Sequence, residues 1–235
     1  MQTIPIAHLA LSFIPAAAVV GYMFQTRRGH KDSLYALSRM VLQLILIGYV
    51  LIYIFESEQP AIVLAALAVM MGAASFIALR TVAPHRRAFF TKALLSIAAG
   101  GGGTLVLVTQ GVLRIDPWYE PSVLIPLAGM IFAASMNAIA LAAERRESEM
   151  KRGTAAEEAT ADAFHTALIP IMNSLFAVGL VTLPGMMTGQ ILSGVSPLIA
   201  ARYQIMVMAM IFGATGLSAL LFLYLTRQRT APSNA

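Results

Sequence analysis

The chain has 235 residues, of which 58% are hydrophobic and only 11% are charged, with a mean hydropathy of +0.76. A water-soluble domain of this length cannot hide so much apolar surface, so lipid must be the solvent for most of the chain. The formal net charge of +5 does not indicate nucleic acid, because the basic residues lie in short clusters between apolar runs. The absence of cysteine excludes disulfides, thiolate nucleophiles and thiolate metal sites.

Seven apolar stretches are long enough to cross a bilayer, which takes roughly 20 residues of helix at a rise of about 1.5 Å per residue. Helices are expected because an open sheet would leave backbone amides unpaired in lipid. No repeat or soluble domain interrupts them, so residues 1–235 are expected to form one transmembrane domain. We therefore predict an all-α, polytopic membrane protein with about seven transmembrane helices, at residues 4–24, 34–55, 61–79, 93–113, 122–143, 167–194 and 203–226.

The basic residues predict the orientation of these helices. Short cytoplasmic loops keep an excess of Lys and Arg, and 14 of the 16 basic residues fall on one side of the predicted membrane. The first stretch has no basic residue before it and is followed by Arg27 and Arg28, as in a retained signal anchor rather than a cleaved signal peptide. We expect a multi-pass protein of the inner (plasma) membrane, with its N-terminus outside and its C-terminus in the cytoplasm.

The longest hydrophilic connection, at about 144–165, is predicted to be cytoplasmic. Thr154 and Glu157 have the spacing of a capping box that would begin a short helix, and Glu158 would further favour its positive end. Alanines at 155, 156, 159, 161 and 163 favour helix and would leave a small-sided surface for a partner protein. The alternative is a solvated surface helix without a partner.

The sixth stretch contains Pro184, which removes a backbone hydrogen bond, and a small-xxx-small pair at Gly185 and Gly189. A kinked or broken helix is expected there, either for packing or along a substrate pathway. Polar side chains within the spans would serve interhelical hydrogen bonds or substrate contact, and the sequence leaves both readings open. The pathway candidates are Gln43, Asn173, Ser174, Pro184, Gly185, Met186, Met187, Gln190 and Gln204, and Asn137 is a further polar residue within a span.

Several kinds of chemistry lack the residues that they need. All 11 Asp and Glu residues lie in connections, so no predicted span holds the carboxylate on which ion-coupled carriers commonly rely. The run Gly100 to Gly103 has no following Lys-Ser or Lys-Thr, so it is no ATP-binding loop, and close helix packing or local flexibility is its favoured role. The 14 methionines are expected to pack, and the four histidines have no spacing that would assemble a metal site. No catalytic residue is predicted.

Three stretches of the sequence resemble one known family. The first runs from Ala167 through Pro170, Asn173 and Ser174 to Val178–Gly189 and continues at Arg202–Val207; the second includes Ser38, Arg39, Leu42–Leu44 and Gly48–Leu51; the third is Ile125–Ile131. Together they cover most of the length in a consistent order along the chain, and they are similar to the FetB-type permeases of ATP-binding-cassette transporters, associated with iron export, and to their relatives, the plant aluminium-tolerance half-transporters. The chain departs from the family pattern where Ala133-Ala134 replaces a Gly-Asn pair and in Arg152–Ala156.

The resemblance implies a permease subunit that is not itself an enzyme. It implies a homodimer of this chain with two copies of a separate ATPase, which would bind ATP and Mg, so that the chain itself binds no cofactor. Coupling to the ATPase would fall on Gly153, Thr154, Glu157 and Glu158. Iron as the exported substrate comes from the resemblance alone, and the alternatives are another metal, a small solute, or a structural or sensory membrane protein without transport.

Overall fold

A computed structural model describes residues 5–27, 29–56 and 59–227, and in these residues the regular secondary structure is helical. One isolated bridge, between Val178 and Thr182, is the exception. The predicted all-α, polytopic membrane fold is therefore confirmed. The chain divides into two compact units, residues 1–57 and 58–235, which are described separately.

The first unit consists of α1 (Ile6–Leu11), α2 (Ile14–Gln25) and α3 (His30–Phe55). The predicted span 4–24 is not one helix, because the chain turns at Ser12 and Phe13 before α2 begins with Pro15 in its first turn. The Ser12 hydroxyl donates to the Leu9 carbonyl at 2.7 Å, which closes the end of α1. The predicted span 34–55 lies entirely within α3.

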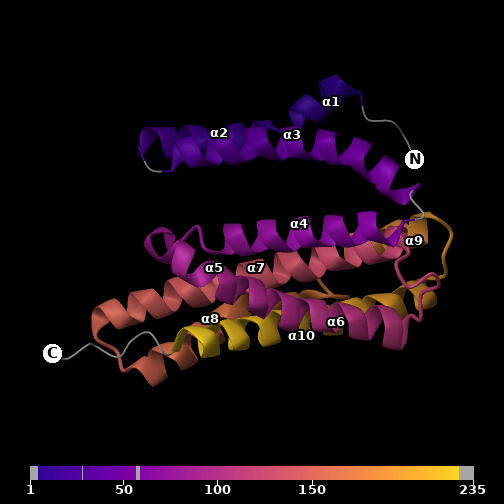
Figure 1. The fold of residues 1–235 in the computed structure, drawn as a ribbon. Coiled ribbons are helices and arrows are strands. Elements are labelled where there is room, and N and C mark those ends of the chain that lie inside the picture. The colour runs from indigo at the N-terminus through magenta and orange to yellow at the C-terminus, as the bar shows by residue number, and fades with distance from the viewer. Residues whose placement is uncertain (1–4, 28, 57–58, 228–235) are drawn as a thin grey trace. The chain divides into compact units, whose positions relative to one another are not determined.

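The second unit is a bundle of longer helices (Figure 1). Its elements are α4 (Pro60–Ala78), the 3₁₀ turn η1 (Ala83–His85), α5 (Arg86–Ser96), the π-helical η2 (Ile97–Gly102), α6 (Gly103–Val106), the π-helical η3 (Leu107–Val112), α7 (Pro121–Arg152), α8 (Ala156–Ala177), α9 (Gly185–Leu192) and α10 (Pro197–Thr226). The segments from α5 to η3 follow one another without a break and form a single membrane-length rod.

Five helical segments among the described residues are long and apolar enough to cross a membrane: His30–Phe55, Pro60–Ala78, Arg86–Val112, Pro121–Arg152 and Pro197–Thr226. They correspond to five of the seven predicted spans. The predicted span 167–194 is interrupted, as expected near Pro184, but the interruption is wider than one proline kink. Helix α8 ends at Ala177, and residues 178–184 form a short non-helical connection to α9.

Helix α7 is much longer than its predicted span of 122–143. It begins with Pro121 at its first position and continues to Gly153, where a φ of +85° in the left-handed region ends it. At about 48 Å, these 32 residues exceed the roughly 30 Å of bilayer hydrocarbon, so the polar residues 144–152 extend beyond the apolar span. Most of the predicted connection 144–165 is therefore helix, with only residues 153–155 between α7 and α8.

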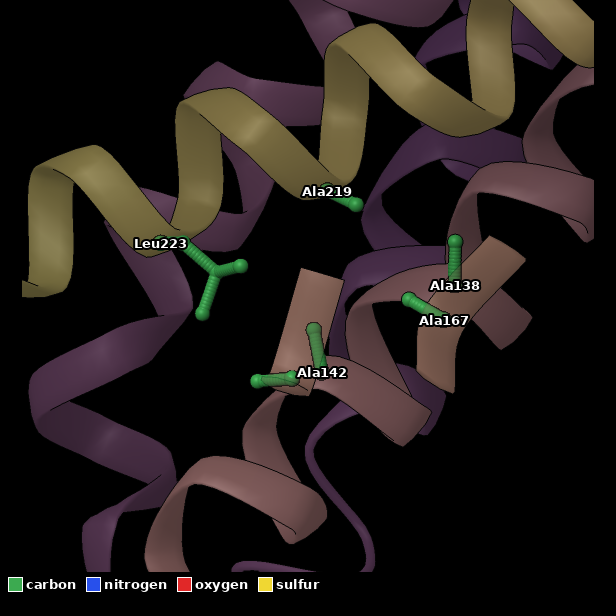
Figure 2. Packing of buried hydrophobic residues seen from close by; sticks show 6 residues of the cluster. Ala138, Ala142, Ala167, Ala219 and Leu223 are labelled. Carbon is green, nitrogen blue, oxygen red and sulfur yellow. The ribbon is translucent and has the colours of Figure 1, made fainter. Parts of the chain in front are cut away.

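Small residues allow α7, α8 and α10 to approach one another closely. The buried cluster consists of Ala138, Ala142, Ala163, Ala167, Ala219 and Leu223, and Figure 2 shows Leu223 of α10 pointing toward the alanines of α7 and α8. In lipid, helices associate through such close packing rather than through a hydrophobic driving force. The cluster fixes the half of α8 that precedes Pro170 against α7.

Gly100 and Gly101 lie where the η2 segment crosses α10 and α7. A Cβ at Gly100 would lie 2.7 Å from the backbone nitrogen of Ser218, and one at Gly101 would lie 3.0 Å from Cγ2 of Ile131. The close-packing role predicted for this glycine run is confirmed at these two positions. At Gly103 nothing lies within 4 Å of such a Cβ, so close packing among the described residues does not account for that glycine.

Candidate functional site

A pocket of about 180 Å³ lies between α7, α8 and α10 in the membrane-spanning part of the second unit. We call it the Asn137 pocket. Its wall is mostly apolar, but it contains the amide of Asn137 and the hydroxyls of Ser174 and Thr215. Asn137 and Ser174 are exposed on the surface of this single chain, whereas Thr215 is buried, so the pocket opens outward from α10. Its full lining is Ala134, Asn137, Ala138, Leu141, Ala167, Pro170, Ile171, Ser174, Ile211 and Thr215.

Thr215 behaves differently from other threonines in these helices. The hydroxyls of Thr104, Thr109 and Thr226 each donate to the carbonyl four residues earlier, at 2.6, 2.9 and 2.8 Å. The Thr215 hydroxyl is buried at the pocket and finds no hydrogen-bond partner among the described residues. A buried hydroxyl without a partner is costly, so a polar group arriving in the pocket would gain a ready hydrogen bond.

Proline introduces a second polar feature into the same wall. Pro170 lies inside α8 and supplies no N–H to the carbonyl of Thr166, one turn earlier. The Ser174 hydroxyl donates to the Pro170 carbonyl at 3.0 Å. The pocket therefore combines neutral oxygen groups with a bend-prone point of α8. Ala134, one of the two alanines at which the sequence departs from the family pattern, also lines it.

The structure brings together only some of the predicted pathway residues. Ser174 lines the Asn137 pocket, while its neighbour Asn173 is exposed and does not. Pro184, Gly185, Met186 and Met187 lie at the beginning of α9 and are also absent from the pocket lining. There the Pro184 carbonyl accepts hydrogen bonds from both the amide and the hydroxyl of Thr188, at 2.9 and 3.1 Å.

Two glutamines have a buried side-chain oxygen that accepts no hydrogen bond from the described residues. Oε1 of Gln190 on α9 and Oε1 of Gln204 on α10 are buried and have no hydrogen-bond partner among the described residues. Gln204 precedes Ile211 and Thr215 by seven and eleven residues, and such spacing puts all three on one face of α10. Gln204 therefore extends the polar face of the pocket along α10.

Gln43 belongs to the first unit and is considered by itself. It is exposed on α3, and with its amide oxygen turned toward Arg39 it accepts from Nε and Nη2 at 3.1 and 3.2 Å. This pairing of residues one helical turn apart gives Gln43 a local role on α3. Its predicted place on a substrate pathway stays a prediction.

The turn between α7 and α8 is organised by Glu149. One of its oxygens, Oε1, lies 3.1 Å from Nη2 of Arg145 and 3.0 Å from Nη1 of Arg152, and the other, Oε2, accepts from the Thr154 hydroxyl at 2.9 Å. Arg145 also reaches Asp162 on α8 at 3.8 Å. The hydrogen bond from Thr154, together with the two guanidinium groups, lowers the pKa of Glu149 below its usual range, although burial opposes this. The carboxylate thus stays charged and holds the turn.

The predicted capping box at this turn is wrong. Thr154 does not cap the following helix, because its hydroxyl donates back to Glu149, and α8 begins at Ala156 without a side-chain cap. The helix is also not a short separate one, since it continues to Ala177. Glu157 and Glu158 do lie in its first turn and are exposed, and Gly153 supplies the left-handed residue that ends α7.

The alanines at the start of α8 divide into two groups. Ala159 and Ala163 are fully buried within this chain, so they are not available to a partner, contrary to the sequence-based expectation. Ala155, Ala156 and Ala161 are exposed beside Glu157 and Glu158. We call these five residues the α8 acidic face, and they are the part of the predicted small-sided surface that is exposed in this chain.

Among the described residues, no group of three or more His, Cys, Asp or Glu side chains could hold a metal ion. The polar groups of the Asn137 pocket are neutral hydroxyl and amide groups.

The pattern of an uncharacterised protein family, UPF0014, matches residues 6–230. The chain is 36% identical to a UPF0014 membrane protein of Synechocystis over 202 residues, which cover 80% of this chain and 78% of that protein. It is 32% identical to a protein of Escherichia coli named "Probable iron export permease protein FetB", over 94% of this chain and 89% of that protein.

A plant relative is the Arabidopsis thaliana protein named ALUMINUM SENSITIVE 3, which is 32% identical over 90% of this chain and 84% of its own length. No solved structure matches. The resemblance to FetB-type permeases and their plant relatives, predicted from the sequence, is confirmed by these matches.

Proposed function

The chain belongs to the UPF0014 family of membrane proteins, and from that membership we propose that it is the permease subunit of an ATP-binding-cassette exporter. The observation that carries the proposal is the 32% identity, over nearly the whole chain, to a protein named as an iron export permease. The sequence holds no GxxxxGK[ST] phosphate-binding loop, so the energy would come from a separate ATPase subunit that binds ATP and Mg. The protein would sit in the inner (plasma) membrane.

The Asn137 pocket supports a pathway between two copies of this chain. Asn137, Asn173 and Ser174 are polar and exposed on helices that cross or enter the membrane, where contact with lipid would be unfavourable. A second copy facing this surface, or water enclosed between the copies, would satisfy these groups. The homodimer thus turns an outward-facing pocket into a central cavity.

The α8 acidic face supports the proposed coupling to the ATPase. Because Glu149 fixes the turn and the alanine cluster fixes the first half of α8, a partner that pushed on Glu157 or Glu158 would move the α7–α8 pair as one body. That body carries Asn137 and Ser174. A closing motion of the ATPases could in this way alter the shape of the pocket.

Iron is the proposed substrate, entering in a hydrated or chelated form because the pocket offers neutral groups only. Export of another metal or a small solute through the same pocket is the second candidate. A structural or sensory role without transport would require no ATPase partner.

Reconstitution tests the proposal. The chain is purified with its ATPase subunit, placed in vesicles and assayed for ATP hydrolysis and for ATP-dependent movement of Fe²⁺, Mn²⁺ and Zn²⁺. An ATPase whose phosphate-loop Lys is replaced serves as the matched control. Stimulation by iron above the other metals supports iron export, and stimulation by another metal supports the second candidate. Movement of solute by the chain alone along an ion gradient would refute the permease assignment.

A further inference from the structure

A second cavity, of about 390 Å³, lies where the beginning of α5 meets the polar end of α7 and the end of α10. We call it the Arg146 cavity. Its apolar wall includes Phe89, Met150 and Phe222, and its polar groups include His85, Arg146 and Glu147. A cavity of this size accommodates a small organic ligand. It is lined by none of the residues of the Asn137 pocket.

Arg146 is a buried cation whose charge is not matched. Only 8% of the residue is exposed, and its Nε donates to the Thr160 hydroxyl at 3.3 Å. Its Nη2 has no hydrogen-bond partner, and Arg146 forms no ion pair, within the part of the chain that the structure describes. Burying a guanidinium without a counterion is costly, so an anion bound beside Arg146 would relieve that cost.

The acidic residues near Arg146 are already paired with other cations. Glu147 also lines the cavity, but its Oε1 lies 2.6 Å from Nζ of Lys151. Glu149 is held by Arg145 and Arg152. The local charge around the cavity is therefore positive, and a negatively charged group is the complement that this chain does not supply from its described residues.

Part of the wall of the Arg146 cavity is aromatic. The ring of His85 stacks on that of Phe89 at 5.6 Å, and Phe89 meets Phe222 edge to face at 6.0 Å. An occupant must then carry both an anionic group for Arg146 and hydrocarbon for these rings. A free inorganic anion would leave the apolar wall unused, whereas an anionic phospholipid offers a phosphate next to glycerol and acyl carbons.

The level of the cavity along the helices agrees with this ligand. Arg146 follows within one turn of Ala143, the last residue of the apolar span predicted from the sequence, so it lies where lipid headgroups meet the hydrocarbon. The other basic residues of α5 and α7 gather at the same end, and basic pockets between transmembrane helices recognise anionic headgroups. We propose that the Arg146 cavity binds the headgroup of an anionic phospholipid, with Arg146 holding its phosphate.

A binding experiment tests this without any need for transport, so its outcome is independent of the proposed function. The purified chain in detergent is mixed with phosphatidylglycerol, with phosphatidylcholine or with inorganic phosphate, and the unfolding midpoint and the number of retained lipids are measured. Phosphatidylglycerol should raise the midpoint and stay bound, whereas the other two should not. An equal shift with inorganic phosphate, or with phosphatidylcholine, would overturn the assignment.

Substitutions then locate the site. Arg146→Gln should weaken phosphatidylglycerol binding roughly 10- to 100-fold, as expected for loss of a charge-assisted hydrogen-bonded pair. Arg87→Gln removes an exposed cation at the same end and should leave binding unchanged. Thr160→Val removes the hydrogen-bond partner of Arg146 but keeps its charge, so binding should persist. Binding that is unchanged in Arg146→Gln would overturn the proposal.

A second variant keeps the test decisive if Arg146→Gln does not fold. Ala143 lines the same cavity, and Ala143→Phe would fill part of it while leaving Arg146 in place. This variant should lose the stabilisation by phosphatidylglycerol. If the full stabilisation remains in the filled cavity, the lipid binds elsewhere and the proposal is wrong.

Discussion

The hydroxyl of Ser218 on α10 donates a hydrogen bond to the hydroxyl of Ser135 on α7, with 3.0 Å between the two oxygens. Both residues are fully buried, and the backbone of Gly100 lies against Ser218. Three segments thus meet at one polar point inside the apolar bundle. Hydrogen bonds between small residues at such crossings hold helices together in lipid.

Replacement of Gly100 by Ala should destabilise the bundle by about 1–3 kcal/mol, the usual cost of overpacking. The new Cβ would lie 2.7 Å from the Ser218 backbone nitrogen, which cannot move aside as a side-chain end can. Thermal unfolding in detergent measures the effect. Gly103→Ala is the control, since that position is open and the change should be neutral or stabilising. Equal midpoints for the two variants would contradict the crossing described here.

Glu149→Gln should lower stability in a way that depends on pH. Because the folded-state pKa of Glu149 is depressed, its stabilisation is complete above the ordinary glutamate value of about 4.3 and is lost as the pH falls through the folded value. The difference in unfolding midpoint between wild type and variant should therefore be constant from pH 7 to pH 6 and shrink below about pH 4. A difference that grows on acidification would disagree with the Glu149 network.

The double variant Glu157→Gln, Glu158→Gln should separate coupling from folding. Both side chains are exposed, so the free energy of unfolding should change only through the loss of two charges at the positive end of α8, by about 0.6–2 kcal/mol. If the α8 acidic face contacts the ATPase, substrate-stimulated ATP hydrolysis should fall several-fold. Glu144→Gln, an exposed acid on α7, is the matched control. Normal stimulation and normal export in the double variant would remove these residues from the coupling surface.

Thr215→Val should leave the protein as stable as the wild type or more stable by about 1 kcal/mol, because it removes a buried hydroxyl that has no partner. Export should nevertheless fall if that hydroxyl contacts the substrate. Thr109→Val should do the opposite, since its hydroxyl is bonded to the Leu105 carbonyl and lies outside the pocket. ATP-dependent metal export and the unfolding midpoint are measured for both. Unchanged export in Thr215→Val would show that the pocket hydroxyl has no part in the pathway.

The long helices could be predicted from the sequence because runs of some 20 apolar residues have few other solutions in lipid. The ends of these helices could not be predicted in the same way. Arg86 to Lys92 are polar enough to be read as a loop, yet α5 includes them, and α7 continues past its apolar part for nine residues, all polar except Met150. Hydropathy indicates which residues lie in lipid. A helix can continue into water until a residue such as Gly153, in the left-handed region, ends its hydrogen bonding.

The candidate pocket was only partly predictable. Asn137 and Ser174 stand out as polar residues in apolar runs, but Thr215 does not, because most intramembrane threonines bond to their own helix. Only the structure reveals that the Thr215 hydroxyl has no hydrogen-bond partner among the described residues. Thr154 and Glu157 had the spacing of a capping box, but the nearer charge network around Glu149 took the threonine hydroxyl. The competing partner is itself local, since Glu149 lies five residues before Thr154 at the end of α7.

Pro170 divides α8 into two parts with different mechanical properties. The part before it is clamped by alanines to α7, and the part after it carries Ser174 and leads into the non-helical residues 178–184. A helix that lacks one backbone hydrogen bond bends most easily there. A force applied at the polar end of α8 would therefore bend the helix at Pro170, which lies in the wall of the Asn137 pocket. In a transporter, a bend of α8 would thus begin beside the pocket, at Pro170, and not at the exposed end of the helix.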